Sequence, residues 1–400
     1  MKLGTIEGPE AQTLAAIGAG YQDGLLGDVL PFWIEHAIDR EHGGFLTALD
    51  RTGGVLDTDK GLWTQARFTW LLGKLYRSVE ARPEWLDLCR HGVEFLDRFA
   101  FDESDGRMWF SVTRDGQPLR KRRYAFSESF AAIAYGEYAA ITGSEAHAQK
   151  ARDCFLRFVN HIPEPKHENT RPTRGLGPPM IAIVSAQELR ASIGFDQADE
   201  WIERSIDQIQ RYHCKPSLRC VLETVGPEGE ILDHFDGRML NPGHAIEGAW
   251  FILREAMHRK RPDWVKLGCQ MLDWTWERGW DQQGGGLSSF VDLNGGPPQT
   301  WWHQMKLWWP HNEAVLATLY AYRATGDPKY LELHRQVHSW THAHFPDTEA
   351  GEWYGYLNAD GTPASPIKGD FWKGPFHLPR MQLYGAAMID EIVNAPLIRQ

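Results

Sequence analysis

Hydrophobic residues recur along most of this chain at the spacing of one face of an α-helix. In segments 71–76 and 315–320, for example, apolar side chains follow one another at intervals of one, three and four. Between such stretches the pattern changes to acidic, glycine-rich turns flanked by short alternating segments. Four of these turns occupy residues 39–45, 101–107, 280–286 and 347–353. The pattern predicts an all-α chain that carries short β-hairpins.

The helical segments also repeat along the chain. Six of them begin after a polar or aromatic loop, at Gly61, Tyr124, Gly175, Asn241, Trp308 and Gly374. Successive starts lie 51 to 67 residues apart, which is enough for two helices and their connections. We expect six such pairs to close into an (α/α)6 barrel, with short β-hairpins and long loops at the active-site end. An open helical solenoid has the same spacing and stays an alternative.

Composition and charge exclude several classes of protein. No proline- or serine-rich tract or charge block divides the chain, so we expect residues 1–400 to form a single domain. The formal charge of −11 argues against a nucleic-acid partner. No apolar run approaches the ~18 residues of a membrane span. Five cysteines without CxxC spacing favour a reducing cytoplasm over a disulfide framework.

Candidate chemistry is most evident at Asn241-Pro242-Gly243-His244, where an N-cap and a proline open a helix. His244 falls in the first turn, and Glu247 follows three residues later on the same face. Glu247 can then bind one imidazole nitrogen and leave the other free for proton transfer, although both residues also suit capping and the helix dipole. Eighteen tryptophans favour a sugar pocket, because indole rings suit the C–H faces of sugars.

Other catalytic signatures are absent or weak. The chain has no GxGxxG, P-loop, GxSxG or HExxH motif. The histidine cluster in residues 338–344 lacks a carboxylate at helical spacing, so we predict a helix face there and no metal site. Glu128, Glu247 and Glu313 leave a two-carboxylate glycoside hydrolase open. A sugar-binding protein without catalysis is a third alternative.

Five motifs, in order over nearly the whole chain, resemble the N-acylglucosamine 2-epimerase family. They are residues 60–67, residues 241–244 with Glu247, residues 306–311 with Glu313, residues 351–356, and residues 373–380. The resemblance implies an (α/α)6 barrel in which His244 and His377 form the catalytic acid/base pair. It also implies a set of substrate-binding side chains, namely Trp63, Arg67, Glu247, Trp308, Glu313 and Arg380. Segment 163–179 has no match, so no contact is carried over there.

The function that this resemblance implies is the interconversion of N-acetylglucosamine and N-acetylmannosamine without a cofactor. One histidine would remove the C2 proton and the other would return a proton to the opposite face, while an arginine stabilises the enediolate. Histidine suits both transfers because its reference pKa is near ~6.5. The alternatives on this scaffold are 2-epimerases or aldose–ketose isomerases of unsubstituted sugars such as mannose, glucose and fructose.

The resemblance also bears on cofactors and partners. Some members of that family use ATP as an activator that is not consumed, and no nucleotide motif in the chain decides this point. The expected partner is a monosaccharide substrate, without nucleic acid, membrane or metal. A homodimer is an open option for assembly, and the expected location is the cytoplasm.

Overall fold

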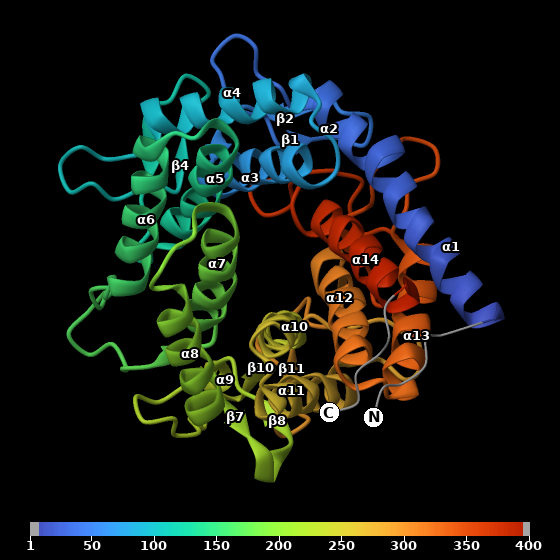
Figure 1. The fold of residues 1–400 in the computed structure, drawn as a ribbon. Coiled ribbons are helices and arrows are strands. Elements are labelled where there is room, and N and C mark those ends of the chain that lie inside the picture. Colours follow the sequence, from blue (N-terminus) through green and yellow to red (C-terminus); the bar gives the residue numbers. More distant parts are fainter. Residues whose placement is uncertain (1–7, 395–400) are drawn as a thin grey trace.

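The computed structural model describes residues 8–394, and its helices form two concentric layers (Figure 1). The inner layer consists of α3 (Leu62–Ser78), α5 (Phe126–Thr142), α7 (Gly177–Ile193), α10 (Pro242–Arg259), α12 (Trp308–Thr325) and α14 (His377–Asn394). The outer layer consists of α1 (Pro9–Gly24) with η1 (Leu25–Val29) and α2 (Leu30–His36), α4 (Pro83–Phe99), α6 (Glu145–Asn160), α8 (Ala198–Gln208) with η2 (Ile209–His213), α11 (Pro262–Gly279) and α13 (Pro328–His344). The predicted (α/α)6 barrel is confirmed.

Local signals explain where the inner helices begin and end. Each begins within three residues of a predicted start. Asn241 caps α10, because its side chain accepts a hydrogen bond from the backbone N–H of His244. Gly143, Gly194 and Gly326 follow α5, α7 and α12 in the left-handed conformation, with φ of 69°, 62° and 67°. Such glycines end a helix and let the chain reverse into the outer layer within a few residues.

The two layers differ in burial, and the inner one closes on itself. Helix α12 buries 15 of its 18 residues, whereas α13 buries five of 17. Trp70 of α3 packs edge-on against Phe376 and Tyr384, with ring centroids 5.4 and 6.4 Å apart, and so joins the first inner helix to the last. The open solenoid is therefore excluded. No helix within residues 8–394 is long and apolar enough to cross a membrane.

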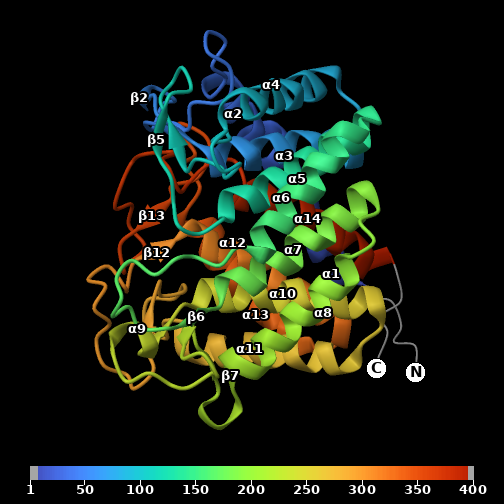
Figure 2. The same ribbon diagram turned by 90° about the vertical axis from the view of Figure 1, so that its left-hand side faces the viewer.

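Short antiparallel strands gather at the end of the barrel where the inner helices begin, on the left of Figure 2. The pairs are β1 (Ala48–Leu49) with β2 (Val55–Asp57), β3 (Lys60–Gly61) with β4 (Ser111–Val112), β4 with β5 (Pro118–Arg120), β6 (Arg174–Gly175) with β9 (Thr224–Val225), β7 (Cys214–Lys215) with β8 (Cys220–Val221), β10 (Met239–Leu240) with β11 (Val291–Asp292), and β12 (Lys306–Leu307) with β13 (Tyr356–Leu357). Two short helices, η3 (Pro216–Leu218) and α9 (Phe235–Arg238), lie in the same loops. Strands β3, β6, β10 and β12 each lead directly into an inner helix, so this sheet framework positions the helix starts.

The four predicted turns are confirmed as hairpins. Each is closed by an antiparallel bridge, Ile38 with Phe45, Phe101 with Met108, Trp280 with Leu287, and Pro346 with Trp353. In each turn an aspartate binds a lysine Nζ from further along the chain: Asp39 with Lys60 at 2.8 Å, Asp102 with Lys121 at 2.5 Å, Asp281 with Lys306 at 3.1 Å, and Asp347 with Lys368 at 2.9 Å. We call these the lysine–aspartate turns. They fasten the hairpins to the loops in front of the inner helices.

Candidate active site

A cavity of about 690 Å³ opens where the inner helices begin, and all six of them contribute to its wall. The helical residues of the wall are Trp63, Arg67, Phe126, Phe130, Gly177, Met180, Ile181, His244, Glu247, Trp308, Trp309 and His377. Loops and strands add Trp301, Trp302, Met305, Leu307, Tyr356 and Trp372. The structure thus brings six of the eight predicted site residues to one cavity. The other two, Glu313 and Arg380, lie directly behind His377.

His244 enters the cavity from the first turn of α10 with one ring nitrogen already engaged. Its Nδ1 lies 2.9 and 3.1 Å from the two carboxylate oxygens of Glu223. Burial is the largest single influence on the pKa of His244 and lowers it, but the charge of Glu223, its hydrogen bond to the ring and the charge of Glu247 together outweigh burial and raise the pKa above its usual value. The other nitrogen, Nε2, is left for a ligand in the cavity.

The prediction that Glu247 binds His244 is wrong. The carboxylate of Glu247 turns instead to Arg380 of α14, at 2.5 Å from its Nη2. Glu223 takes the expected place from the loop between β8 and β9, 21 residues before His244. Its backbone oxygen accepts a hydrogen bond from Leu176, beside the pairing of β6 with β9. No local sequence signal marks Glu223, because long-range strand pairing sets its position.

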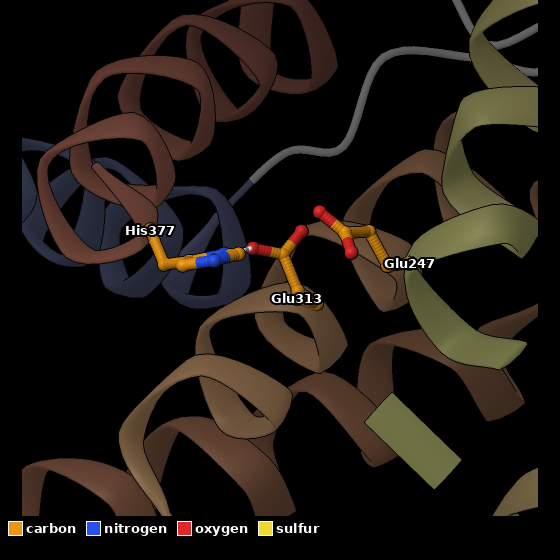
Figure 3. A group of neighbouring side chains, drawn as sticks. All are labelled: Glu247, Glu313 and His377. Carbon is orange, nitrogen blue, oxygen red and sulfur yellow. Dashed lines mark hydrogen bonds and ion pairs between the residues drawn. The ribbon is translucent and has the colours of Figure 1, made fainter. Parts of the chain in front are cut away.

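His377, the first residue of α14, is the second histidine of the cavity. Its Nδ1 lies 2.7 Å from Oε1 of Glu313 on α12, as Figure 3 shows. The second oxygen of Glu313 accepts a hydrogen bond from Trp250 Nε1 at 2.7 Å. Burial lowers the pKa of His377 well below its usual value, and the charge of Arg380 contributes to the lowering. The ring is therefore neutral near pH ~7.

Arg380 ties the carboxylates behind His377 together. Its Nη2 lies 2.5 Å from Glu247 and 2.6 Å from Glu313. Glu247, Glu313 and His377 also form a group whose ligand atoms lie within 4.8 Å of one another, a spacing that suits a metal ion (Figure 3). The same Nη2 is 3.4 Å from His377 Nδ1, so a guanidinium nitrogen contacts all three members of the group. A cation is thus supplied by the chain itself.

Arg67 is the opposite case, a buried cation without a bonded partner. It is 9% exposed, and its guanidinium lies over the rings of Phe130 and Phe376 at 4.0 and 4.6 Å. Within the part of the chain that the structure describes, no carboxylate forms a salt bridge with it and its Nε has no partner. Burial lowers the pKa of Arg67 to about 9, so the side chain still carries a positive charge near pH ~7. Its donors are free to bind substrate oxygens.

Tryptophan rings line the cavity beside the two histidines, and one of them contacts both. Trp309 lies with its ring centroid 5.3 Å from that of His244 and 5.7 Å from that of His377. Trp309 therefore contacts both imidazoles on the cavity wall. Trp308 packs at 6.2 Å from His377, and Trp63 donates from Nε1 to Ser127 at 3.2 Å. The sequence predicted Trp63 and Trp308, whereas Trp309 follows from its place next to Trp308 in the first turn of α12.

The remaining candidates lie elsewhere. Glu128 is fully buried and binds Arg107 at 2.6 Å, so it cannot act in the cavity. The histidines of α13 form a helix face as predicted, for example His344, whose Nδ1 bonds the backbone oxygen of Trp340. A second hollow of about 990 Å³ lies near the other ends of the inner helices and contains no predicted site residue.

Both the sequence and the fold of this chain are similar to those of known proteins. A family model described as N-acylglucosamine 2-epimerase (GlcNAc 2-epimerase) matches residues 43–374. The chain is 38% identical over 392 residues to the N-acylglucosamine 2-epimerase of Bos taurus, covering 93% of this chain and 90% of that relative. It is similar in fold to a cellobiose 2-epimerase from Spirochaeta thermophila DSM 6192, with a TM-score of 0.84, 22% identity and coverage of 97% and 100%. A D-mannose isomerase is similar at a TM-score of 0.79, 17% identity and coverage of 96% and 99%.

Proposed function

The chain belongs to the N-acylglucosamine 2-epimerase family, and we propose that it interconverts N-acetylglucosamine and N-acetylmannosamine without a cofactor. One observation carries this proposal above the others. His244 and His377 reach one cavity from different helices, and each has its Nδ1 bound by a glutamate. Each therefore presents Nε2 to the cavity as a proton-transfer group.

The proposed proton transfers use these two histidines and a neutral sugar in its open-chain form. One histidine takes the proton from C2, the electrons of the broken C–H bond form a C1=C2 double bond, and the electrons of the carbonyl π bond move to O1. Because C2 carries an acetamido nitrogen, this intermediate is an enolate; an unsubstituted sugar would give the enediolate. The other histidine gives a proton to the opposite face of C2, which reforms the aldehyde and inverts the centre. Positioned acid/base groups of this kind each contribute about 10²- to 10⁴-fold in rate.

Arg67 is the proposed group that stabilises the enolate oxygen O1. The intermediate carries a negative charge that the substrate lacks, and Arg67 is a desolvated cation with unfilled donors. We propose that Trp63 and Trp308 form stacking walls for the sugar. Glu247, Glu313 and Arg380 hold each other and His377, and we assign their effect on the substrate to that support.

The wall between α5 and α7 favours an N-acylated substrate. Phe126, Phe130, Met180 and Ile181 form an apolar surface there, which suits the methyl of an acetamido group. The same histidine pair could also serve an unsubstituted sugar, and a proton delivered to C1 in place of C2 would give an aldose–ketose isomerase. The likeness to a D-mannose isomerase extends to the fold.

A two-carboxylate hydrolase is a poor fit to the same site. A retaining glycosidase needs two carboxyl groups about 5 Å apart that flank the glycosidic bond, one of them as an acid. Glu247 and Glu313 instead share the guanidinium of Arg380 behind His377, and Glu128 is outside the cavity. Of the three, Glu247 alone lines the cavity, so no two of them form a pair that flanks a substrate.

The test is incubation with N-acetylmannosamine, mannose or cellobiose in D2O, followed by NMR. The proposal predicts N-acetylglucosamine that carries deuterium at C2. Turnover of mannose alone would overturn the acyl-sugar assignment, and an absence of C2 exchange with every sugar would overturn the epimerase.

Five further expectations belong to this proposal. Residues 1–400 would form one catalytic domain that acts in the cytoplasm, with no metal required. Comparing the epimerisation rate with and without added ATP tests whether ATP is an activator. Light scattering tests whether the protein is a homodimer.

A further inference from the structure

We propose that Glu223 is a positioning residue that makes the two histidines unequal: it keeps His244 as the protonated member of the pair and leaves His377 as the neutral one. The inference rests on the proposed two-histidine reaction and deepens it. It assigns a role to a residue outside the motifs that define the site, on a loop that strand pairing alone brings to His244.

The contacts of Glu223 support this role. Both of its carboxylate oxygens lie close to His244 Nδ1, at 2.9 and 3.1 Å, and the side chain of Glu223 is only 16% exposed. Among residues 8–394, no lysine or arginine forms a salt bridge with this carboxylate. No cation other than the His244 ring therefore pairs with its charge there, and a charge-assisted bond of this kind favours the protonated ring.

The carboxylate behind His377 is in a different situation. Glu313 is bonded to His377, but it also binds the guanidinium of Arg380 and the indole N–H of Trp250. The positive charge of Arg380 and the N–H of Trp250 offset the negative charge of Glu313, so this charge stabilises a protonated His377 ring less. Burial then decides the protonation of His377, and burial favours the neutral form.

The charges around the cavity agree with a single shared proton. Arg67 and Arg380 lie near Glu247 and Glu313, and Glu223 binds His244. With all five groups charged, two positive and three negative charges leave one net negative charge. One protonated histidine balances it. The charged groups that face His244 are Glu223 from the β8–β9 loop, Glu247 on α10 and His377 on α14, while α12 contributes the uncharged ring of Trp309. Beyond Glu223, burial lowers the pKa of His213, which keeps that ring neutral.

Both directions of the reaction need a single proton on the pair, because one histidine must accept the C2 proton while the other donates. The direction in which His377 takes the C2 proton starts from the state with His244 protonated, and the reverse direction starts after that proton has moved to His377. Below the pKa of His377 both rings are protonated and no base remains. Above the pKa of His244 both are neutral and no acid remains. The rate profile is then a bell whose upper limb reports the raised pKa of His244.

The experiment compares Glu223→Gln, Glu223→Ala and the control Glu228→Gln, an exposed glutamate in the loop that follows β9. Glutamine keeps an acceptor for Nδ1–H but removes the charge, so we expect the upper limb to move down by about one pH unit. Alanine removes the acceptor too, and we expect a further loss in kcat of about tenfold with little change in KM. The control should keep the profile of the unaltered protein.

A second readout does not depend on turnover. With 13C-labelled histidine, the ring signal that disappears in His244→Asn reports the titration of His244, and this titration should move to lower pH in Glu223→Gln. An unchanged upper limb and titration in Glu223→Gln, or an equal shift in Glu228→Gln, would overturn the role of Glu223. Loss of C2 exchange in the unaltered protein would instead overturn the proposed reaction, so the two failures are distinguishable.

Discussion

Lys60 and Arg67 lie seven residues apart in the sequence, and they show how differently two regions of this molecule treat a buried cation. Lys60 belongs to a lysine–aspartate turn, and its Nζ bonds Asp39, Gly43 and Arg114 within 2.8 Å. Arg67 belongs to the cavity, and within residues 8–394 its guanidinium meets aromatic faces without a salt bridge.

The difference shows that the lysine–aspartate turns support the fold, whereas Arg67 serves the proposed reaction. A saturated buried ion pair holds the hairpins in place, since breaking it would leave a charge without compensation. An unsaturated buried cation costs stability, yet it is prepared for a negative charge that appears only during reaction. Variants of the turns should therefore damage the fold, whereas variants of the cavity should damage turnover.

The largest expected effect is on turnover in the histidine variants. His244→Asn and His377→Asn each remove one proton-transfer group, so kcat should fall by about 10²- to 10⁴-fold. The melting temperature should stay near that of the unaltered protein. His167→Asn, at an exposed position outside the cavity, is the control. Near-normal turnover in either cavity variant would remove that histidine from the acid/base pair.

Arg67→Met should come next. Loss of the group that stabilises the enolate should lower kcat by about 10²- to 10³-fold. Stability should be unchanged or higher, because the variant removes a desolvated charge that lacks bonded partners. Kinetics and thermal unfolding of Arg67→Met are compared with those of Arg204→Met on the exposed surface. A strongly destabilised Arg67→Met protein with normal kcat would show that Arg67 supports the fold and not turnover, which would contradict the account.

Lys60→Met should show the converse behaviour. The free energy of unfolding should fall by about 3 kcal/mol, the lower end of the range for a broken buried pair, because Arg114 still binds Asp39. The kcat of the folded fraction should change little. Urea unfolding and active-site titration measure the two quantities. Lys150→Met, which breaks the surface pair with Asp97, should cost about 1 kcal/mol or less.

The smallest effect concerns pH and the turn that contains Asp347. Hydrogen bonds from Arg51 chiefly, and from Lys368, hold the pKa of Asp347 well below its usual range. A lowered pKa adds stability above the unfolded value near ~3.9 and loses it as the pH falls below that value. Asp347→Asn should therefore be less stable by about 2 kcal/mol near pH ~7, with a difference that shrinks near pH ~3. If the difference in the free energy of unfolding between Asp347→Asn and the unaltered protein stayed constant from pH ~7 to pH ~3, the ion-pair account would be contradicted.

Much of the fold was predictable because its signals are local. Caps, prolines and the aromatic loops marked all six inner helices, and the acidic glycine-rich segments marked all four hairpins. Closure of the ring was less accessible, since α14 takes its outer partner α1 from the other end of the chain. Helical periodicity carries no information about such a contact.

The residues of the candidate site likewise fall into those that local motifs predict and those that depend on long-range contacts. His244, His377 and Arg67 occur in motifs, and the helix starts bring them together. The partner of His244 was mispredicted, because local spacing pointed to Glu247 while a salt bridge across the barrel draws that carboxylate to Arg380. Glu223 depends on the pairing of β6 with β9, which two-residue strands do not reveal in sequence.

The most direct measurement of the two-histidine claim is C2 exchange in D2O with each histidine variant and each N-acetyl sugar separately. A histidine that remains can still remove the proton that faces it and return deuterium to the same side. His377→Asn should thus label one of the two sugars and His244→Asn only the other, and neither variant should interconvert them. If both variants labelled the same sugar, or either one still produced the second epimer at the normal rate, the two-histidine account would be contradicted.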